Sequence, residues 1–178
     1  MPLHVTSELA GQIDEVVSHY PEHYRRAPVL WVLHLLQDHY GFLGPEQVEW
    51  AAARLGVPPV DVWELVSFYP MFAEEPRGRF HFKVCRSLSC ELGGCRGILE
   101  RVSQRLGLQA EQTSPDGRFT ISTFECLADC GNGPVLMVND ELFEHLTPEK
   151  VDGILDRILQ SDRLDPQPLP PVQPPHPL

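Results

Sequence analysis

The chain has 178 residues, of which 25 are acidic and 14 are basic, and its formal net charge is -11. This length is enough for one sizeable domain or two small ones without disulfide bonds. The acidic balance argues against a nucleic-acid partner, because phosphate binding needs clustered Lys and Arg. The longest apolar run, "PVLWVLHLL", is shorter than the ~20 residues that cross a bilayer, and the start lacks a signal-peptide pattern. We therefore expect a cytoplasmic protein without a direct membrane span.

The first part of the sequence has the apolar spacing of amphipathic helices. Pro28 and Pro45 stand where the first turn of a helix tolerates proline, and Gly41 and Gly56 stand where a left-handed C-cap is expected. Ser7 is a plausible N-cap for the first helix. We expect helices over 7–20, 27–40, 45–55 and 60–68.

The pattern changes after residue 74. "RFHFKV" alternates as a strand does, "ELGGCRGILERVSQRLG" is helical and ends at Gly107, "FTISTFE" is a second strand, and "VLMV" and "LFEHL" flank a hairpin turn. A last helix follows Thr147, its expected N-cap. The sequence predicts an α+β fold: a helical bundle over 1–74, a β-α-β-β-α domain over 79–160, and a disordered proline-rich tail over 161–178.

The five cysteines include two pairs, "CRSLSC" at 85–90 and "CLADC" at 126–130. Each pair follows a predicted strand, and two loops at strand ends can converge so that four thiolates enclose one ion or cluster. We expect a helix beginning near Glu91 to direct its N-terminal N–H groups at that anionic site. Gly131 and Gly133 allow the close backbone approach that hydrogen bonding to sulfur requires.

Two kinds of metal site suit four cysteines. Structural zinc is one, although its ligand pairs usually have two to four intervening residues in small knuckles. Spacings of C-x4-C recur in iron-sulfur proteins and favour a [2Fe-2S] cluster. Acidic neighbours such as Glu125 and Asp129 would make a low-potential, one-electron carrier. A thiol oxidoreductase is disfavoured, because neither pair is C-x-x-C.

The two cysteine pairs in these contexts resemble the thioredoxin-like [2Fe-2S] ferredoxin domain. With "SFY" at 67–69, "PDGRFT" at 115–120 and "ECLADCGNGP" at 125–134, the chain up to about residue 160 resembles the family of the small [2Fe-2S] subunit, or E-type subunit, of NADH-quinone oxidoreductase, respiratory complex I. The resemblance implies that Cys85, Cys90, Cys126 and Cys130 bind one [2Fe-2S] cluster. Ala128 stands where the family commonly has Gly, and Cys95 lies outside the ligand pattern.

The resemblance also implies partners. FMN and NADH are expected only in an adjoining large subunit, beside further iron-sulfur subunits, in an oxidoreductase and translocase that delivers electrons to quinone. The chain would then be a non-autonomous subunit, peripheral to the inner face of the cell membrane through its complex. Close relatives serve NAD-linked hydrogenases and formate dehydrogenases as diaphorase subunits. The alternative, from another functional class, is an interaction module whose fold is stabilised by zinc.

Overall fold

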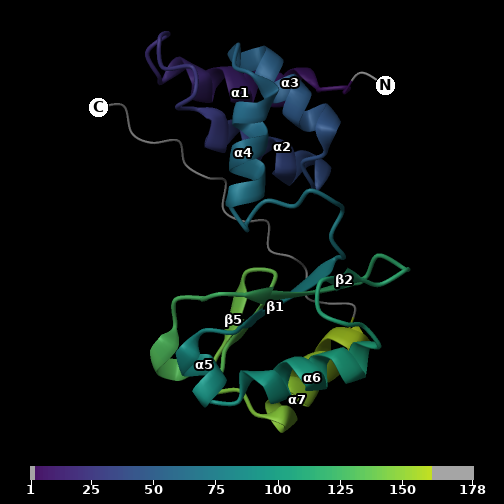
Figure 1. Cartoon of the computed structure of the whole chain (residues 1–178). Coiled ribbons are helices and arrows are strands. Elements are labelled where there is room, and N and C mark those ends of the chain that lie inside the picture. The colour runs from purple at the N-terminus through teal and green to yellow at the C-terminus, as the bar shows by residue number, and fades with distance from the viewer. Residues whose placement is uncertain (1–2, 162–178) are drawn as a thin grey trace. The chain divides into compact units, whose positions relative to one another are not determined.

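The computed structural model describes residues 3–161, so the predicted tail lies outside the described residues from position 162 onward. The chain divides into two compact units, one extending to Pro76 and the other beginning at Arg77 (Figure 1). Each unit has its own hydrophobic core.

Four helices make up the first unit: α1 (Ser7–Ser18), α2 (Val29–Tyr40), α3 (Pro45–Leu55) and α4 (Pro59–Phe68). Gly41 and Gly56 adopt the left-handed conformation just after α2 and α3, as predicted. The prediction for the start of α1 is wrong by one residue. Thr6 is the N-cap, and its hydroxyl accepts a hydrogen bond from the Leu9 N–H at 3.2 Å.

The second unit contains a five-stranded sheet with the order β2-β3-β1-β4-β5. β1 and β3 are parallel, and the other neighbouring pairs are antiparallel. Its elements are β1 (Phe80–Cys85), α5 (Leu88–Leu92), α6 (Cys95–Leu106), β2 (Gln112–Thr113), β3 (Phe119–Phe124), a 3-10 turn η1 (Cys130–Asn132), β4 (Leu136–Val138), β5 (Glu141–Phe143) and α7 (Pro148–Ser161).

Helices α6 and α7 lie together on one side of the sheet in Figure 1. The alternating residues Phe80, Phe82 and Val84 of β1 are buried in the same core as Val102 of α6 and Leu155 of α7. Because successive side chains of a strand point to opposite faces, His81, Lys83 and the last residue, Cys85, lie on the other face of β1.

The helix predicted after Cys90 is divided in the structure. α5 already contains Cys90 and ends at Leu92, and α6 begins only at Cys95. Gly94 between them has a φ of 92°, a left-handed conformation that a helix cannot continue through. The expectation that a helix beginning near Glu91 directs its N-terminus at the site is therefore wrong.

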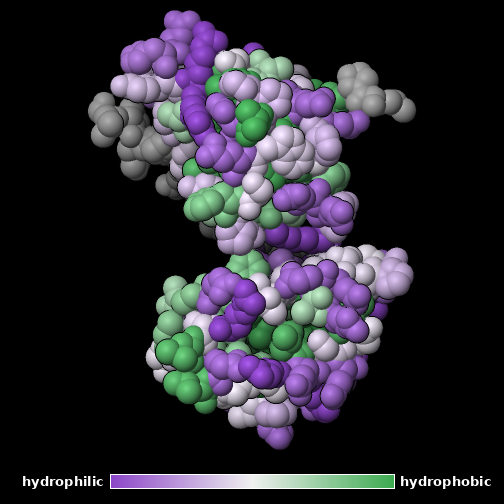
Figure 2. Space-filling model, viewed as in Figure 1, coloured by the Kyte–Doolittle hydropathy of each residue, from purple (hydrophilic) through white to green (hydrophobic). Residues whose placement is uncertain are grey.

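The fold is α+β, as predicted, with N-terminal helices followed by a mixed sheet and its helices. No helix within residues 3–161 is both long and apolar enough to span a membrane. Hydrophobic side chains gather on the second unit where α5 lies (Figure 2). Leu88 and Leu92, at the two ends of this helix, are 77% and 82% exposed.

Candidate metal centre

The parallel pairing of β1 and β3 brings the two cysteine loops together. Cys85 is the last residue of β1, and its register partner Phe124 is the last residue of β3. The carboxyl ends of parallel strands lie at one edge of a sheet. The loop after each strand therefore starts from the same edge, so "CRSLSC" and "CLADC" begin side by side.

The first loop holds a buried pair of thiols. Cys85 is 1% exposed, Cys90 is not exposed at all, and the two belong to one buried cluster. Gly133 lies directly against Cys90, since a Cβ built on it would be only 3.2 Å from Cys90 Sγ. Any larger residue at 133 would crowd this sulfur, so the close backbone approach expected of Gly133 is present.

The second loop holds an exposed pair. The Sγ atoms of Cys126 and Cys130 are 3.6 Å apart, and both residues are exposed. The Ala128 N–H donates to Cys126 Sγ at 3.3 Å. The centre thus has one thiol pair inside the protein and one thiol pair at its surface.

Contacts across the two loops hold the buried and exposed pairs close together. The Ser89 hydroxyl of α5 donates to the Cys130 carbonyl oxygen at 2.6 Å. The guanidinium of Arg86 forms an ion pair with Glu125. These contacts, absent from any sequence pattern, fix the position of the second loop against the first.

Backbone N–H groups point at the sulfur atoms. Burial would raise the pKa of the Cys85 thiol, but hydrogen bonding with the Ser87 hydroxyl and with the N–H groups of Ser87 and Leu127 outweighs burial and leaves this pKa below its ordinary value. Burial raises the pKa of Cys90, and a hydrogen bond from the Val135 N–H opposes the rise. The fold therefore already supplies hydrogen bonds for anionic sulfur at Cys85 and Cys90.

In the exposed pair, one thiol opposes ionisation of the other. The Cys126 thiol, by hydrogen bonding and by charge, raises the pKa of Cys130, and Cys85 adds to this effect from the other loop. A second negative sulfur is costly beside the first unless positive charge is bound between them. The pairs thus favour binding of a cationic metal group over coexistence of free thiolates.

Cys95 packs in the same buried cluster as Cys85 and Cys90, but its hydrogen-bond partner is a carboxylate. Its residue is 3% exposed, and its Sγ donates to Glu91 Oε2 at 3.3 Å. Burial, together with the hydrogen bond to Glu91 and the charge of that carboxylate, raises the pKa of Cys95 to about 11. Cys95 is therefore a protonated, buried thiol at neutral pH. We do not predict it as a metal ligand.

The donor set can be compared with the two metal sites considered above. Within residues 3–161, no group of three or more Cys, His, Asp or Glu side chains is arranged to hold a single metal ion. The thiols are arranged as two pairs instead. A four-cysteine [2Fe-2S] cluster has two irons, with two thiolates on each, and its sulfur atoms accept hydrogen bonds. Two sulfur pairs with N–H groups directed at them fit that group.

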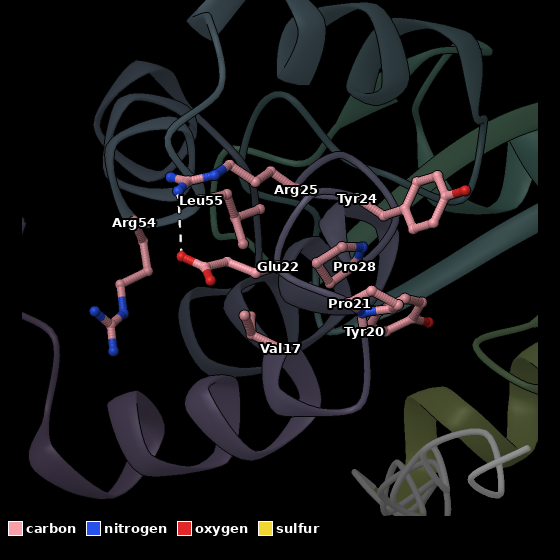
Figure 3. Close-up of a pocket in the computed structure, with 9 residues that line it drawn as sticks. All are labelled: Val17, Tyr20, Pro21, Glu22, Tyr24, Arg25, Pro28, Arg54 and Leu55. Atoms are coloured by element: carbon pink, nitrogen blue, oxygen red, sulfur yellow. Dashed lines mark ion pairs between the residues drawn. The ribbon is translucent and has the colours of Figure 1, made fainter.

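A separate cleft lies in the first unit and has different chemistry. Its volume is about 200 Å³, and Figure 3 shows Arg25 and Glu22 turned toward each other within it, paired at 3.8 Å. The lining residues are Val17, Tyr20, Pro21, Glu22, Tyr24, Arg25, Pro28, Arg54 and Leu55. No thiol or imidazole is among these lining residues.

Comparison with known proteins agrees with this geometry. The model of the thioredoxin-like [2Fe-2S] ferredoxin family matches residues 13–159. An E-type subunit of the NADH-quinone oxidoreductase of Rhizobium meliloti is 36% identical over 153 residues, which are 86% of this chain and 90% of that protein. NADH-quinone oxidoreductase subunit 2 of Thermus thermophilus is 33% identical over 154 residues, 86% of this chain and 85% of the relative.

A solved structure shares the fold. A chain of an NAD⁺-reducing [NiFe]-hydrogenase, in the air-oxidized state, superimposes with a TM-score of 0.67 and 19% identity over 82% of this chain. The aligned part is 25% of the hydrogenase chain, and the likeness shows the fold alone.

The fold and its paired thiols are those of an iron-sulfur protein with a thioredoxin-like architecture, and this chain belongs to the thioredoxin-like [2Fe-2S] ferredoxin family. Relatives that align with this chain over most of their own length are E-type subunits of NADH-quinone oxidoreductase. The family resemblance inferred from the sequence is confirmed. Membership implies a [2Fe-2S] cluster.

Proposed function

We propose that this chain carries one [2Fe-2S] cluster on Cys85, Cys90, Cys126 and Cys130 and transfers single electrons in the NADH-oxidising module of an NADH-quinone oxidoreductase. The observation that supports this most is the convergence of the two loops. Parallel register places Cys85 level with Phe124, and the Ser89 hydroxyl ties α5 to the loop of the second pair. The similarity to E-type subunits over most of the chain supports the choice of complex.

The protein's part in this function is to hold sulfur atoms and hydrogen-bond them. The bound cluster supplies a centre that gains or loses one electron. The buried pair would anchor one side of it, and N–H donors from Leu127 and Val135 would stabilise the negative charge on its sulfurs. The exposed pair would leave the other side accessible, so electrons would pass through the loop 126–130.

The reaction requires a partner with a flavin. NADH gives up a hydride, which carries two electrons together, whereas this cluster accepts one. The sequence contains no G-x-G-x-x-G fingerprint for a dinucleotide. An FMN-containing, NADH-binding subunit would therefore convert two-electron to one-electron transfer, with further iron-sulfur subunits beyond it. The chain would contribute to an enzyme without being catalytic alone.

Redox partners have to approach the centre closely, and the surface around it suits docking. Leu88 and Leu92 are exposed side chains of α5, the short helix that also contains the buried Cys90. Burying such side chains against a partner stabilises a complex by roughly 1.5–3 kcal/mol each. These two leucines would form part of the interface through which the partner faces the cluster.

Single Cys→Ser substitutions test the ligand set. Serine offers a hard oxygen where iron-sulfur chemistry favours thiolate, so replacing any of the four proposed ligands should abolish or strongly reduce iron, sulfide and visible absorption. Cys95→Ser is the matched control, since it removes a nearby thiol that interacts with Glu91. A full native spectrum in Cys126→Ser would contradict the assignment.

The complex to which the subunit belongs is tested by its partners. Co-purification with quinone-reducing, membrane-bound subunits supports the proposal. Co-purification with a hydrogenase or a formate dehydrogenase would instead assign the chain to the equivalent diaphorase module. A colourless protein with one zinc would support the interaction module and contradict electron transfer.

A further inference from the structure

The hydroxyl of Ser87 has an unusual direction. Ser87 occupies the N-cap position of α5, and its carbonyl oxygen accepts the Glu91 N–H at 2.8 Å. Serine at an N-cap usually accepts a second hydrogen bond through its side chain, from an N–H of the first turn. Here the side chain makes no capping bond, and its Oγ lies 3.4 Å from Cys85 Sγ. The side chain is directed at sulfur.

Ser87 lies two residues after Cys85 in the first cysteine loop, and its hydroxyl contacts the sulfur of that cysteine. Ser89, two positions along the same helix, behaves differently, because its hydroxyl donates to a backbone carbonyl. Two serines of "CRSLSC" thus have separate tasks, one toward sulfur and one toward the neighbouring loop.

The donor and acceptor roles at Ser87 follow from the protonation of the thiol. A free Cys85 thiol can donate its proton to the hydroxyl oxygen. A cysteine sulfur bound to iron has no proton and can only accept. In the cluster-bound protein the O–H of Ser87 must then be the donor. Hydrogen bonds to cysteine sulfur are one of the factors that set the reduction potential of iron-sulfur clusters.

We propose that Ser87 is a positioning residue whose hydroxyl donates to the Cys85 sulfur and raises the reduction potential of the cluster. The inference rests on the proposed function, since it requires a cluster on these cysteines. Reduction adds negative charge that spreads onto the cysteine sulfurs, and a donor at Cys85 stabilises the reduced form more than the oxidised form. Losing the donor makes the one-electron reduction less favourable.

The experiment is a redox titration of the full-length, cluster-loaded chain with dithionite, monitored by absorption and electron paramagnetic resonance. Ser87→Ala should keep full iron and sulfide yet shift the midpoint potential downward, so that the reduced-to-oxidised ratio at a fixed poise falls several-fold. Ser87→Thr, which keeps the hydroxyl, should restore the potential. Ser103→Ala is the matched control: it removes the same group from the half-buried Ser103 of α6 and should leave the potential near that of the unmodified chain.

The outcomes separate this inference from the proposed function. A fully loaded Ser87→Ala variant with an unchanged potential overturns the role of Ser87 and leaves the cluster assignment intact. An unmodified chain that binds no cluster overturns the proposed function itself. If Ser87→Ala cannot retain a cluster, Ser87→Thr decides: a threonine variant with normal loading and potential supports the hydroxyl-to-sulfur bond, and one as defective as alanine overturns it.

Discussion

The backbone N–H of Ala128 donates to Cys126 Sγ from a residue in the left-handed conformation, with a φ of 61°. This conformation costs an L-residue other than glycine roughly 1–2 kcal/mol. In this conformation the amide is directed at the sulfur. The site therefore stores local backbone strain in a residue that contributes no side-chain chemistry.

Replacing Ala128 by Gly should stabilise the second unit. Glycine adopts the left-handed conformation freely, although its greater freedom in the unfolded chain offsets about 0.4–1 kcal/mol of the gain. We expect a net rise of up to about 1 kcal/mol in the free energy of unfolding, measured by urea denaturation, with the cluster retained. Ala128→Val, with a branched Cβ, should have the opposite effect and accelerate cluster loss. Lower stability for the glycine variant would show that the turn is not strained.

Asp129 should lower the potential of the cluster. Its Oδ1 accepts from Asn132 Nδ2 at 2.8 Å, whereas its Oδ2 is buried and finds no hydrogen-bond partner in the described part of the chain. Asp129→Asn can keep the first contact while removing a negative charge next to Cys130. Adding an electron should then be easier, so the midpoint potential should rise.

The control for Asp129 is Glu100→Gln, which removes the same charge from the exposed side of α6. Its effect should be much smaller, because solvent and salt screen exposed charges. Equal shifts in the two variants would mean that total charge matters and that the position of Asp129 does not.

His81 should make the second unit sensitive to acid. It is 5% exposed, with Nε2 2.9 Å from Ser122 Oγ. Burial, and then the positive charges of Arg77 and Lys83, lower the pKa of His81 from 6.5 to about 3. The unfolded chain therefore binds a proton at a higher pH than the folded chain does. The stability that depends on neutral His81 is complete above about pH 6.5 and is lost as the pH falls toward 3.

Urea denaturation between pH 7 and pH 4 measures this effect. The free energy of unfolding of the unmodified chain should fall over that range. In His81→Gln, whose side chain can still bond to Ser122 but does not titrate, the slope should be smaller. Parallel pH profiles for the two chains would show that His81 does not carry the sensitivity.

The two units should separate without loss of the centre. The core of the first unit and the core of the second contain no residue in common, and the four proposed ligands all follow Arg77. A chain that begins at Arg77 should fold and bind the cluster, as iron content and absorption would show. It should bind the flavin-containing partner more weakly, because we expect the helical unit, which contributes none of the proposed ligands, to add docking surface to that of Leu88 and Leu92. Undiminished partner affinity would contradict only the docking prediction.

Local sequence signals predicted most of the helices. Proline at a first position and glycine after a last turn marked α3, and Thr147 marked the start of α7 through its hydroxyl, which accepts the Lys150 N–H at 3.3 Å. The short strand β2 was missed, because two residues, Gln112 and Thr113, carry no periodic pattern. The break between α5 and α6 was missed because glycines inside a helical pattern do not reveal the sign of φ.

The convergence of the thiol pairs could be predicted from the sequence. The hydrogen-bond donors that surround the sulfur atoms could not. Cysteine spacing and strand endings indicated that the pairs converge. The donors to sulfur were not recognisable, since Leu127 and Val135 act through backbone N–H groups, which every residue of an ordinary loop possesses. Ser87 could have been suspected from its place between Cys85 and Cys90, but serine before a helix is ordinarily a cap. Only the folded loops show which way its hydroxyl points.

The most direct measurement is the metal and sulfide content of the full-length chain purified without oxygen, combined with its electron paramagnetic resonance spectrum after reduction by dithionite. We predict about two irons and two sulfides per chain and the signal of a one-electron-reduced [2Fe-2S] cluster. That signal should be absent from Cys85→Ser and Cys130→Ser and present in Cys95→Ser. A chain that contains zinc without sulfide, or that remains free of metal with its thiols all titratable, would contradict the assignment of a [2Fe-2S] cluster.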